Sequence, residues 1–446
     1  MSGTLRAGDR VELEVDALGP AGEGVGSLGS RRLSVPGAFP GERVEARLEA
    51  LSRQGPRAFG TLLRVLEPHP GRRESLCAAS EQAGGRCGGC RLLTLEEPAQ
   101  REAKVAMLRE VHGLPVEGLT PPPAELGYRL SAKRVAFGGP GRIRFGSWQR
   151  GTRRPASMDG CLVDHPSLAL AAARLAGALR DEGLRAHDAR RGEGLVHGAW
   201  LKGDGERVLA TLVTGPAAPA EAQALERVAR ALPELHGLAW SVKRDAGGDL
   251  RGEPATLLRG SARIALALGD EVLDVGPLGF VQPHPAAAHA MYEALVGGTA
   301  RGELALDLYA GAGLTTRRLA QRFAEVRPCE ANPEAAARLG VPAQRVGAFL
   351  ERQLAAGAAP DLVVANPPRA GLGAEVTAAL RQIDAPELRV LACGPAGLAK
   401  DLEALGAPEG PGVPYRLSSL RGFDPLPQTP HVELLAVLQR SSSTST

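Results

Sequence analysis

The last third of the chain alternates short apolar runs with helical patterns, and this alternation limits the fold more than any other feature of the sequence. The runs GELALDLY, AEVRPCE, PDLVVAN and LRVLAC have the length and composition of buried strands. Segments with the apolar spacing of helices separate them from about residue 271 onward. Alternating strands and helices build a mostly parallel, doubly wound sheet. We therefore predict an α/β domain over residues 271–440.

The rest of the chain follows other patterns. Residues 1–66 contain short alternating strands separated by Gly and Pro, which is typical of a small β-barrel. Residues 67–270 combine hairpin signals with the Ala-rich helical segment PSLALAAARLAGALRDEG, so we expect a central α+β domain. A helix over about 94–114 is expected to pack on the C-terminal domain. The tail 441–446, SSSTST, is expected to be disordered.

Composition excludes several classes of protein. The 446 residues suffice for two or three domains, and the hydrophobic fraction of 43% is ordinary for a globular protein. We find no secretory signal and no apolar run long enough to span a bilayer, so we expect a cytoplasmic monomer without membrane contact. In that compartment the six cysteines indicate metal binding or catalysis rather than disulfides.

Positive charge is concentrated in one stretch. The net charge of +3 does not by itself indicate a nucleic-acid partner. Residues 129–154, however, contain eight Lys or Arg and no Asp or Glu, with Phe137, Phe145 and Trp148 between them. This pattern is typical of an RNA-facing surface built from strands. A solvated hairpin with no ligand is the alternative, and the stretch alone does not decide between them.

A glycine-rich turn, LALDLYAGAGLTTRRLA, lies between a predicted strand and a helix. Gly311 and Gly313 allow the backbone to approach a ligand, and ligands of open α/β sheets lie beyond the carboxyl ends of the strands. The third glycine of the dinucleotide fingerprint is absent. Glu330 ends the next strand, where an acid can bind ribose hydroxyls. The turn is compatible with S-adenosylmethionine, which has no pyrophosphate, or with a purely structural role.

Two further strands end in unusual residues. Asn366-Pro367-Pro368-Arg369 closes one of them, and its prolines prevent continuation into helix or sheet. Cys393 closes the next and is followed by Gly394-Pro395 and a helical pattern. A cysteine here is either a small buried hydrophobe or a nucleophile at the mouth between strand and helix. We interpret it as a nucleophile, with Gly394 allowing the tight turn.

The segment FDPLPQTPHVELLAVL near the end places His431 and Glu433 before a terminal strand. With GFVQPHP at residues 279–285, it resembles the RNA (uracil-5-)-methyltransferases, especially the TRAM-bearing branch that acts on 23S ribosomal RNA. The resemblance covers nearly the whole chain. It implies an OB-like TRAM barrel that binds RNA, a central iron–sulfur domain and a Rossmann-like S-adenosylmethionine-dependent methyltransferase domain. The implied partner is 23S ribosomal RNA, with transfer RNA as the alternative.

The resemblance also implies roles for individual residues. Cys393 would be the nucleophile that adds to carbon 6 of uracil, and Glu433 the base that removes the carbon-5 proton. A free thiol is mostly protonated at neutral pH, so we expect the site to favour the thiolate. The implied S-adenosylmethionine contacts are Gln282, Tyr309, Gly311, Gly313, Leu314, Glu330 and Asn366. The implied ligands of a 4Fe–4S cluster are Cys77, Cys87, Cys90 and Cys161, with structural zinc as the alternative.

Several positions depart from the family pattern. Asn366 stands where an aspartate is usual, Gly394 where an asparagine is usual, and Leu314 where a polar residue is usual. Nine residues separate Cys77 from Cys87 where five are common. We favour a divergent but active uracil methyltransferase. The alternatives are an amino-group methyltransferase that uses Asn366 and a weakened paralogue that binds RNA.

Overall fold

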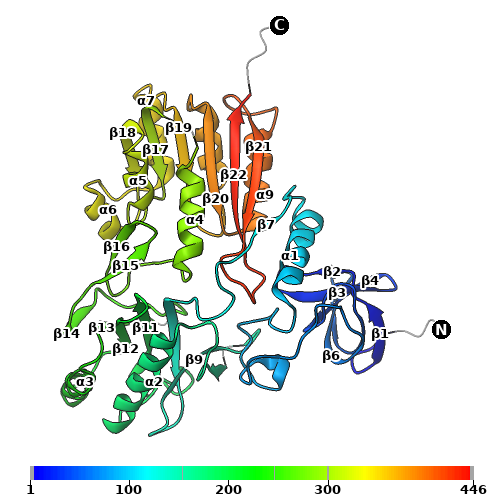
Figure 1. Cartoon of the computed structure of the whole chain (residues 1–446), viewed down its shortest axis with the longest axis vertical. Helices are drawn as coiled ribbons and strands as arrows, with labels where there is room; N and C mark the ends of the chain where they lie inside the picture. The colour runs from blue at the N-terminus through cyan, green and yellow to red at the C-terminus, as the bar shows by residue number, and fades with distance from the viewer. Residues whose placement is uncertain (1–4, 153, 246, 299–300, 442–446) are drawn as a thin grey trace.

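The structure is a computed structural model and describes residues 5–152, 154–245, 247–298 and 301–441. A C-terminal sheet with its helices occupies one half of the molecule, and two other sheets lie side by side in the other half (Figure 1). Most of the predicted disordered tail, residues 442–446, lies outside the described residues. Among the described helices, none is both long and apolar enough to cross a membrane.

The N-terminal strands form a six-stranded sheet in the order β1-β5-β6-β4-β3-β2. The Asp16 N–H donates to the Val25 carbonyl at 3.0 Å, so the chain leaving β1 returns to β3 and the sheet curls into a half-barrel. Small apolar side chains, including Leu33, Val35 and Val44, fill its interior. Its strands are β1 (Arg10–Glu14), β2 (Ala17–Leu18), β3 (Glu23–Leu28), β4 (Arg31–Pro36), β5 (Arg43–Leu51) and β6 (Arg57–Glu67).

A second sheet of seven strands has the order β10-β9-β8-β11-β12-β13-β14. Leucines and alanines of α2 (Pro166–Asp181) and α3 (Pro219–Ala231) share one apolar cluster with this sheet. The Ala-rich helix is thus confirmed. The strands are β8 (Ser131–Phe137), β9 (Arg144–Trp148), β10 (Pro155–Ser157), β11 (Val196–Gly203), β12 (Val208–Thr214), β13 (Gly237–Val242) and β14 (Thr256–Gly260), and a separate hairpin of β15 (Ile264–Leu268) and β16 (Glu271–Val275) follows.

The C-terminal sheet has the order β18-β17-β19-β20-β22-β21-β7. Its first four strands in that order pair in parallel, which confirms the predicted doubly wound arrangement, whereas β22 runs antiparallel to both β20 and β21. The short strand β7 (Leu119–Thr120) comes from the first third of the chain and pairs with β21. The remaining strands are β17 (Gly302–Leu308), β18 (Phe323–Cys329), β19 (Leu362–Ala365), β20 (Glu387–Ala392), β21 (Tyr415–Phe423) and β22 (Glu433–Arg440).

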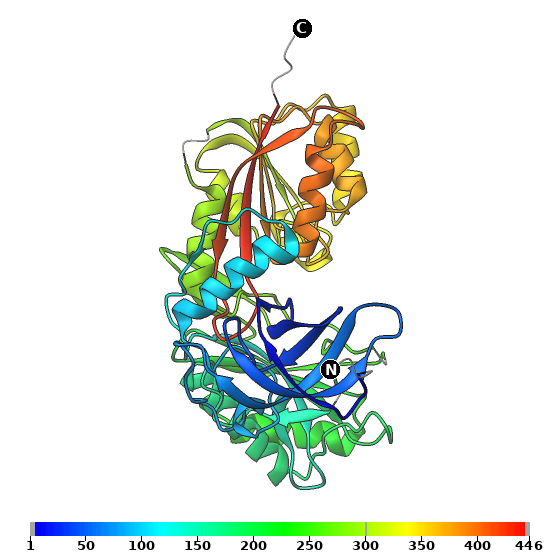
Figure 2. The ribbon, with the colours of Figure 1, turned by 90° about the vertical axis from the view of Figure 1, so that its right-hand side faces the viewer.

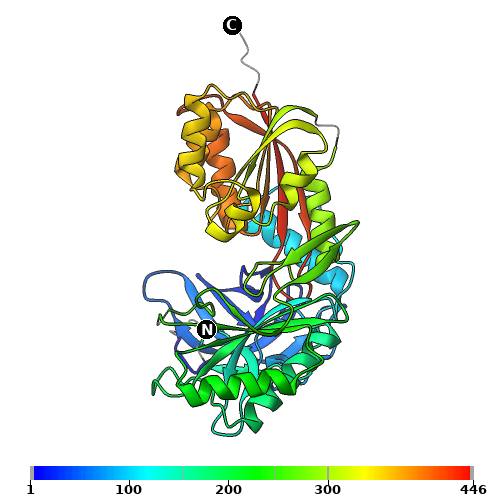
Figure 3. The same cartoon turned by 90° about the vertical axis from the view of Figure 1, so that its left-hand side faces the viewer.

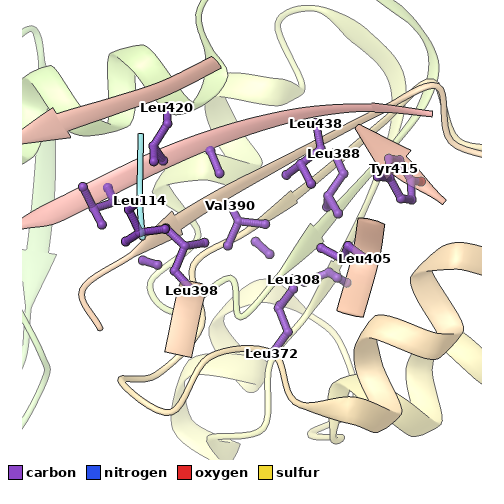
Figure 4. Close-up of a cluster of buried hydrophobic side chains, with 14 of the residues drawn as sticks. Leu114, Leu308, Leu372, Leu388, Val390, Leu398, Leu405, Tyr415, Leu420 and Leu438 are labelled. Carbon is purple, nitrogen blue, oxygen red and sulfur yellow. The ribbon is translucent and has the colours of Figure 1, made fainter. Parts of the chain in front are cut away.

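Helices cover both faces of this sheet, and successive strand residues contribute to opposite faces. Leu388 and Val390 of β20 belong to one cluster, whereas Leu391 belongs to another. The first cluster packs against α1 (Glu97–His112), α7 (Val346–Ala355), α8 (Ala374–Gln382) and α9 (Pro395–Gly406) (Figure 4). The second packs against α4 (Pro285–Val296) and α5 (Leu314–Leu319), which lie across the sheet from α8 and α9 (Figure 3). Helix α6 (Pro333–Leu339) follows β18.

Candidate active site

The carboxyl ends of three parallel strands bring the predicted site residues to one edge of the C-terminal sheet. Tyr309 follows β17, Asn366 follows β19 and Cys393 follows β20. The antiparallel strand β22 enters at the same edge with Glu433 as its first residue. Because Ala392 pairs with Leu434, the antiparallel register sets Cys393 opposite Glu433. The sheet therefore joins residues that are 40 positions apart in sequence.

The electrostatics of this pair favour the protonated forms of both groups. Burial raises the pKa of the Cys393 thiol and the negative charge of Glu433 raises it further, while Arg369 lowers it. Glu433 is 6% exposed, and burial raises its pKa to about 7 against the opposing effects of a Gln282 hydrogen bond and the Arg369 charge. The expectation that the site favours the thiolate is therefore wrong for the free protein. Arg369 is the one group that lowers both pKa values.

The turn after Cys393 depends on close contact rather than on an unusual backbone conformation at Gly394. Gly394 has φ −118°, which any residue can adopt, so no left-handed backbone is required here. A Cβ at Gly394 would instead lie 2.2 Å from the carbonyl oxygen of Arg369. The glycine thus allows the Asn-Pro-Pro-Arg turn to pass directly over the start of α9. A larger residue at this position would displace Arg369 from the thiol.

The glycine-rich turn after β17 has the geometry of a ligand loop. Tyr309, Gly311 and Gly313 all have positive φ, of 60°, 55° and 78°. The Gly311 N–H donates to Glu330 Oε2 at 2.8 Å, which fixes the carboxylate beneath the loop. A Cβ at Gly311 would meet nothing nearer than the Tyr309 carbonyl at 4.0 Å, so the turn faces open space. Leu314 differs, because its side chain is buried in the cluster beneath α4 and α5.

Two buried residues behind this edge escaped the sequence analysis. Asp307 accepts a hydrogen bond from the Thr316 hydroxyl at 2.6 Å, and burial raises its pKa to about 7. Burial and the charge of Glu433 raise the pKa of Tyr292 of α4 to about 12, while Asn366 acts in the opposite direction. Asp307 stands in the glycine-turn segment but was not singled out there, and Tyr292 stands in no recognisable motif. Their position behind the strand ends depends on packing that local sequence patterns do not reveal.

A clamp from α1 holds the segment that leads into Glu433. Lys104 Nζ lies 2.7 Å from Asp424 Oδ2, and both side chains are fully buried. Gln100 accepts from the Gln428 backbone N–H and donates to the Gln428 side chain, both at 2.8 Å. Gln428 has φ 70°, a conformation that costs energy in a non-glycine residue. In Figure 2, α1 crosses the base of the C-terminal unit beside this loop.

The four cysteines assigned to a cluster come from two segments of the central region. Burial raises the pKa of Cys90 to about 12, and the charges of the other three cysteines add to the effect, so the thiols share one neighbourhood. Within the described residues, however, no group of three or more His, Cys, Asp or Glu side chains is arranged to hold a metal ion. As placed, the residues do not form a finished metal site. The predicted iron–sulfur cluster is therefore not shown, and neither is zinc.

The basic stretch divides into buried and exposed parts. Arg134 is 3% exposed and forms a buried ion pair with Asp164, and Phe145 packs in the central core. Trp148 and Arg150, at the connection between β9 and β10, face solvent instead. Arg134 and Phe145 thus stabilise the central domain, whereas most of the other basic residues of the stretch remain exposed, namely Lys133, Arg142, Arg144, Arg150 and Arg154.

Comparison with known proteins identifies the family. No family model matches the sequence. An uncharacterized RNA methyltransferase from Parasynechococcus marenigrum is 31% identical, and the match covers 98% of this chain and 97% of the relative. The chain belongs to the RNA methyltransferases. Another member of this family, from Synechocystis, is 27% identical over 97% of the chain and 96% of its own length.

The architecture of this RNA methyltransferase also occurs in a solved structure. The tRNA (uracil-54, C5)-methyltransferase of Pyrococcus abyssi, in complex with S-adenosyl-L-homocysteine, has a TM-score of 0.71 with this chain. The similarity covers 96% of this chain and 99% of the other, at 23% sequence identity. It shows that the half-barrel, central sheet and C-terminal sheet occur together in one known fold.

Proposed function

We propose that this RNA methyltransferase uses S-adenosylmethionine to methylate carbon 5 of a uridine. The observation that carries the proposal is the pairing of Cys393 with Glu433 at the carboxyl ends of the strands, beside the glycine turn. A methyltransferase that acts on an amino group has no use for a half-buried thiol facing a buried carboxylate. The P. abyssi protein, a tRNA (uracil-54, C5)-methyltransferase, adds support from the fold.

The chain's own residues account for the chemistry at the uracil ring. The Cys393 thiolate adds to carbon 6 of uracil, which makes carbon 5 nucleophilic. After carbon 5 has taken the methyl group and the donor's sulfur–carbon bond has broken, Glu433 removes the proton from carbon 5, and elimination breaks the bond between Cys393 and carbon 6 and restores the thiolate. Arg369 stabilises the thiolate by its positive charge. The negative charge of the ionised Glu433 opposes formation of the thiolate, and the Arg369 charge acts against this effect.

The residues around the glycine turn fit the methyl donor. Gly311 faces open space and Glu330 lies fixed behind it, where a carboxylate can accept from ribose hydroxyls. Gln282, Tyr309, Gly313 and Asn366 complete the proposed contacts, and only the backbone of Leu314 is free to take part. S-adenosylmethionine supplies an electrophilic methyl group for carbon 5 when it is bound there.

We propose 23S ribosomal RNA as the substrate and transfer RNA as the alternative, with the half-barrel acting as a TRAM domain over residues 1–66. The deciding experiment uses purified protein, methyl-labelled S-adenosylmethionine and total RNA lacking 5-methyluridine, followed by mass spectrometry of the digested nucleosides. Label in 5-methyluridine is expected, and fractionation of the RNA then identifies the substrate. Label in a methylated amino base would instead support the Asn366 alternative.

The pH dependence of the reaction follows from the two raised pKa values. Glu433 must be ionised to accept a proton, and its pKa of about 7 means that acid pH removes the base. The raised pKa of Cys393 also requires a higher pH for the thiolate. We expect kcat/KM to rise from about pH 6 through pH 8. A profile that is flat over this range would contradict the assignment, and Glu433→Gln should remain at a low rate throughout.

We also propose that Cys77, Cys87, Cys90 and Cys161 bind a 4Fe–4S cluster, supported by their mutual electrostatic influence. Protein purified without oxygen is expected to contain iron and acid-labile sulfide in equal amounts. Cys90→Ser should lose both, whereas Cys329→Ser, which changes a buried cysteine of the C-terminal core, should retain them. Zinc without sulfide would favour the alternative metal, and the absence of both metals would refute the site.

A further inference from the structure

An open cavity of about 760 Å³ lies where the half-barrel, the cysteine segment, the central sheet and the C-terminal sheet meet. Four short segments line it, one from each of these regions. They are residues 20–21 before β3, residues 88–91 of the cysteine segment, residues 147–152 at the β9–β10 connection and residues 430–431 before β22. We call it the Trp148 pocket. A volume of this size accommodates a ligand of several hundred daltons.

The lining combines an aromatic face with positive charge. Trp148 lines the cavity and is 47% exposed, so its ring is accessible to a ligand. Arg91 and Arg150 line the same cavity from two different segments. Glu81 pairs with Arg150 at 3.2 Å, and both side chains of this pair remain partly exposed. One carboxylate against two guanidinium groups leaves the pocket positively charged.

The pocket shares a border with the reaction centre. His431 lines it, and the chain reaches Glu433 only two residues later. Burial lowers the pKa of His431, and the charges of Arg369, Lys104 and Arg91 lower it further, so His431 lies within the influence of both sites. Arg369 in turn acts on the Cys393 thiol. A polymer that places one base at Cys393 therefore passes beside the pocket.

We propose that the Trp148 pocket binds an unpaired nucleotide that neighbours the target nucleotide in the RNA. Its base stacks on the Trp148 ring, and Arg91 and Arg150 contact its phosphate groups. Stacking on aromatic rings is the common way for proteins to hold bases of single-stranded RNA, and arginines bind the accompanying phosphates. The inference rests on the proposed function in that it takes the target base to lie at Cys393. It adds a second point of recognition, which a paired helix could not occupy.

Tryptophan fluorescence of the full-length protein tests the stacking directly. Of the three tryptophans, all within the described part of the chain, Trp200 is buried and Trp240 is half-buried. Acrylamide should therefore quench Trp148 most strongly. A single-stranded RNA of about 12 nucleotides is expected to protect this emission, whereas a duplex of the same sequence is not. The decrease in quenching caused by RNA should be absent in Trp148→Phe and present in Trp240→Phe.

Binding measurements test the affinity and the phosphate contact. Trp148→Ala is expected to weaken binding of the single strand about 10-fold, and Trp148→Phe by no more than about 3-fold, because a phenyl ring still stacks. A plot of log affinity against log salt concentration has a negative slope. Arg150→Gln should make this slope shallower by about 0.7, the value for one lost phosphate contact on a single strand. Arg191→Gln is the matched control, since this exposed arginine pairs with Asp188 and is not among the residues lining the pocket.

The outcomes separate this proposal from the proposed function. Equal quenching of Trp148 with and without the single-stranded RNA would overturn the proposal that the pocket binds a nucleotide. Wild-type RNA affinity of a folded Trp148→Ala protein would overturn it as well. Protection of Trp148 in a protein that makes no 5-methyluridine supports the pocket and refutes the proposed function. Should the alanine variant fail to fold, the quenching experiment on the wild-type protein decides alone.

Discussion

Cys393→Ala is expected to lower the rate of RNA methylation by about 10⁴-fold or more, the order of loss seen when an enzyme loses a residue that acts jointly with its base. Without the thiol, carbon 5 of uracil remains a poor nucleophile whatever the position of the methyl donor. The side chain lies at the strand end and is only half-buried, so its removal leaves the sheet intact. The measurement is single-turnover formation of 5-methyluridine.

A matched control removes the other cysteine of the same sheet. Cys329 ends β18, where its thiol is buried in the core and lies 3.7 Å from the Gln344 carbonyl. Cys329→Ala should keep methylation within a few-fold of wild type. Unchanged melting temperature and S-adenosylmethionine affinity in Cys393→Ala would place its defect in the chemistry. A Cys393→Ala enzyme with full activity would refute the thiol mechanism.

Lys104→Met is expected to destabilise the C-terminal unit by about 3–5 kcal/mol, which lowers its Tm by roughly 6–20 °C. The substitution removes the cation that pairs with Asp424. The Asp424 carboxylate is fully buried, so water cannot replace that cation. Because Asp424 begins the segment held by α1, methylation should fall together with stability. Thermal unfolding followed by circular dichroism measures the effect.

The control and the rescue both follow from the burial of this ion pair. Lys133 pairs with Asp249 at 3.9 Å, but both side chains are more than half exposed, so Lys133→Met should shift Tm very little. Adding Asp424→Asn to Lys104→Met removes the uncompensated charge and should recover part of the lost stability. Equal effects of Lys104→Met and Lys133→Met would show that the buried pair does not hold the loop.

Local pattern was sufficient for the elements that carry most of the site. The apolar runs that end at Leu308, Ala365 and Ala392 are strands, the glycine turn follows the first of them, and a helix begins at Pro395. These predictions succeed because strand length, proline and glycine act on the backbone within a few residues. The same reasoning placed Gly394 in a tight turn, but it could not show that the missing Cβ makes room for the Arg369 carbonyl of a distant turn.

The contacts that sequence reasoning missed all join distant segments. Strand β7 adds to the C-terminal sheet from position 119, and Lys104 meets Asp424 across 320 residues. Asp307 stands in the glycine-turn segment, but its burial, like that of Tyr292, comes from packing with other elements. The direction of the Cys393 pKa shift was likewise inaccessible, because it depends on burial and on the charge of Glu433.

The sequence by itself determined the class of the C-terminal domain, the positions at which strands end, and the family that the motifs resemble. Those properties depend on residue types within short windows, which periodicity and turn chemistry record. Only the tertiary structure decided that Cys393 faces Glu433, that α1 clamps the intervening loop, and that Trp148 opens onto a cavity beside His431. Each of these depends on sheet register or packing between segments far apart in the chain, where the free energy of burial selects partners that no local pattern specifies.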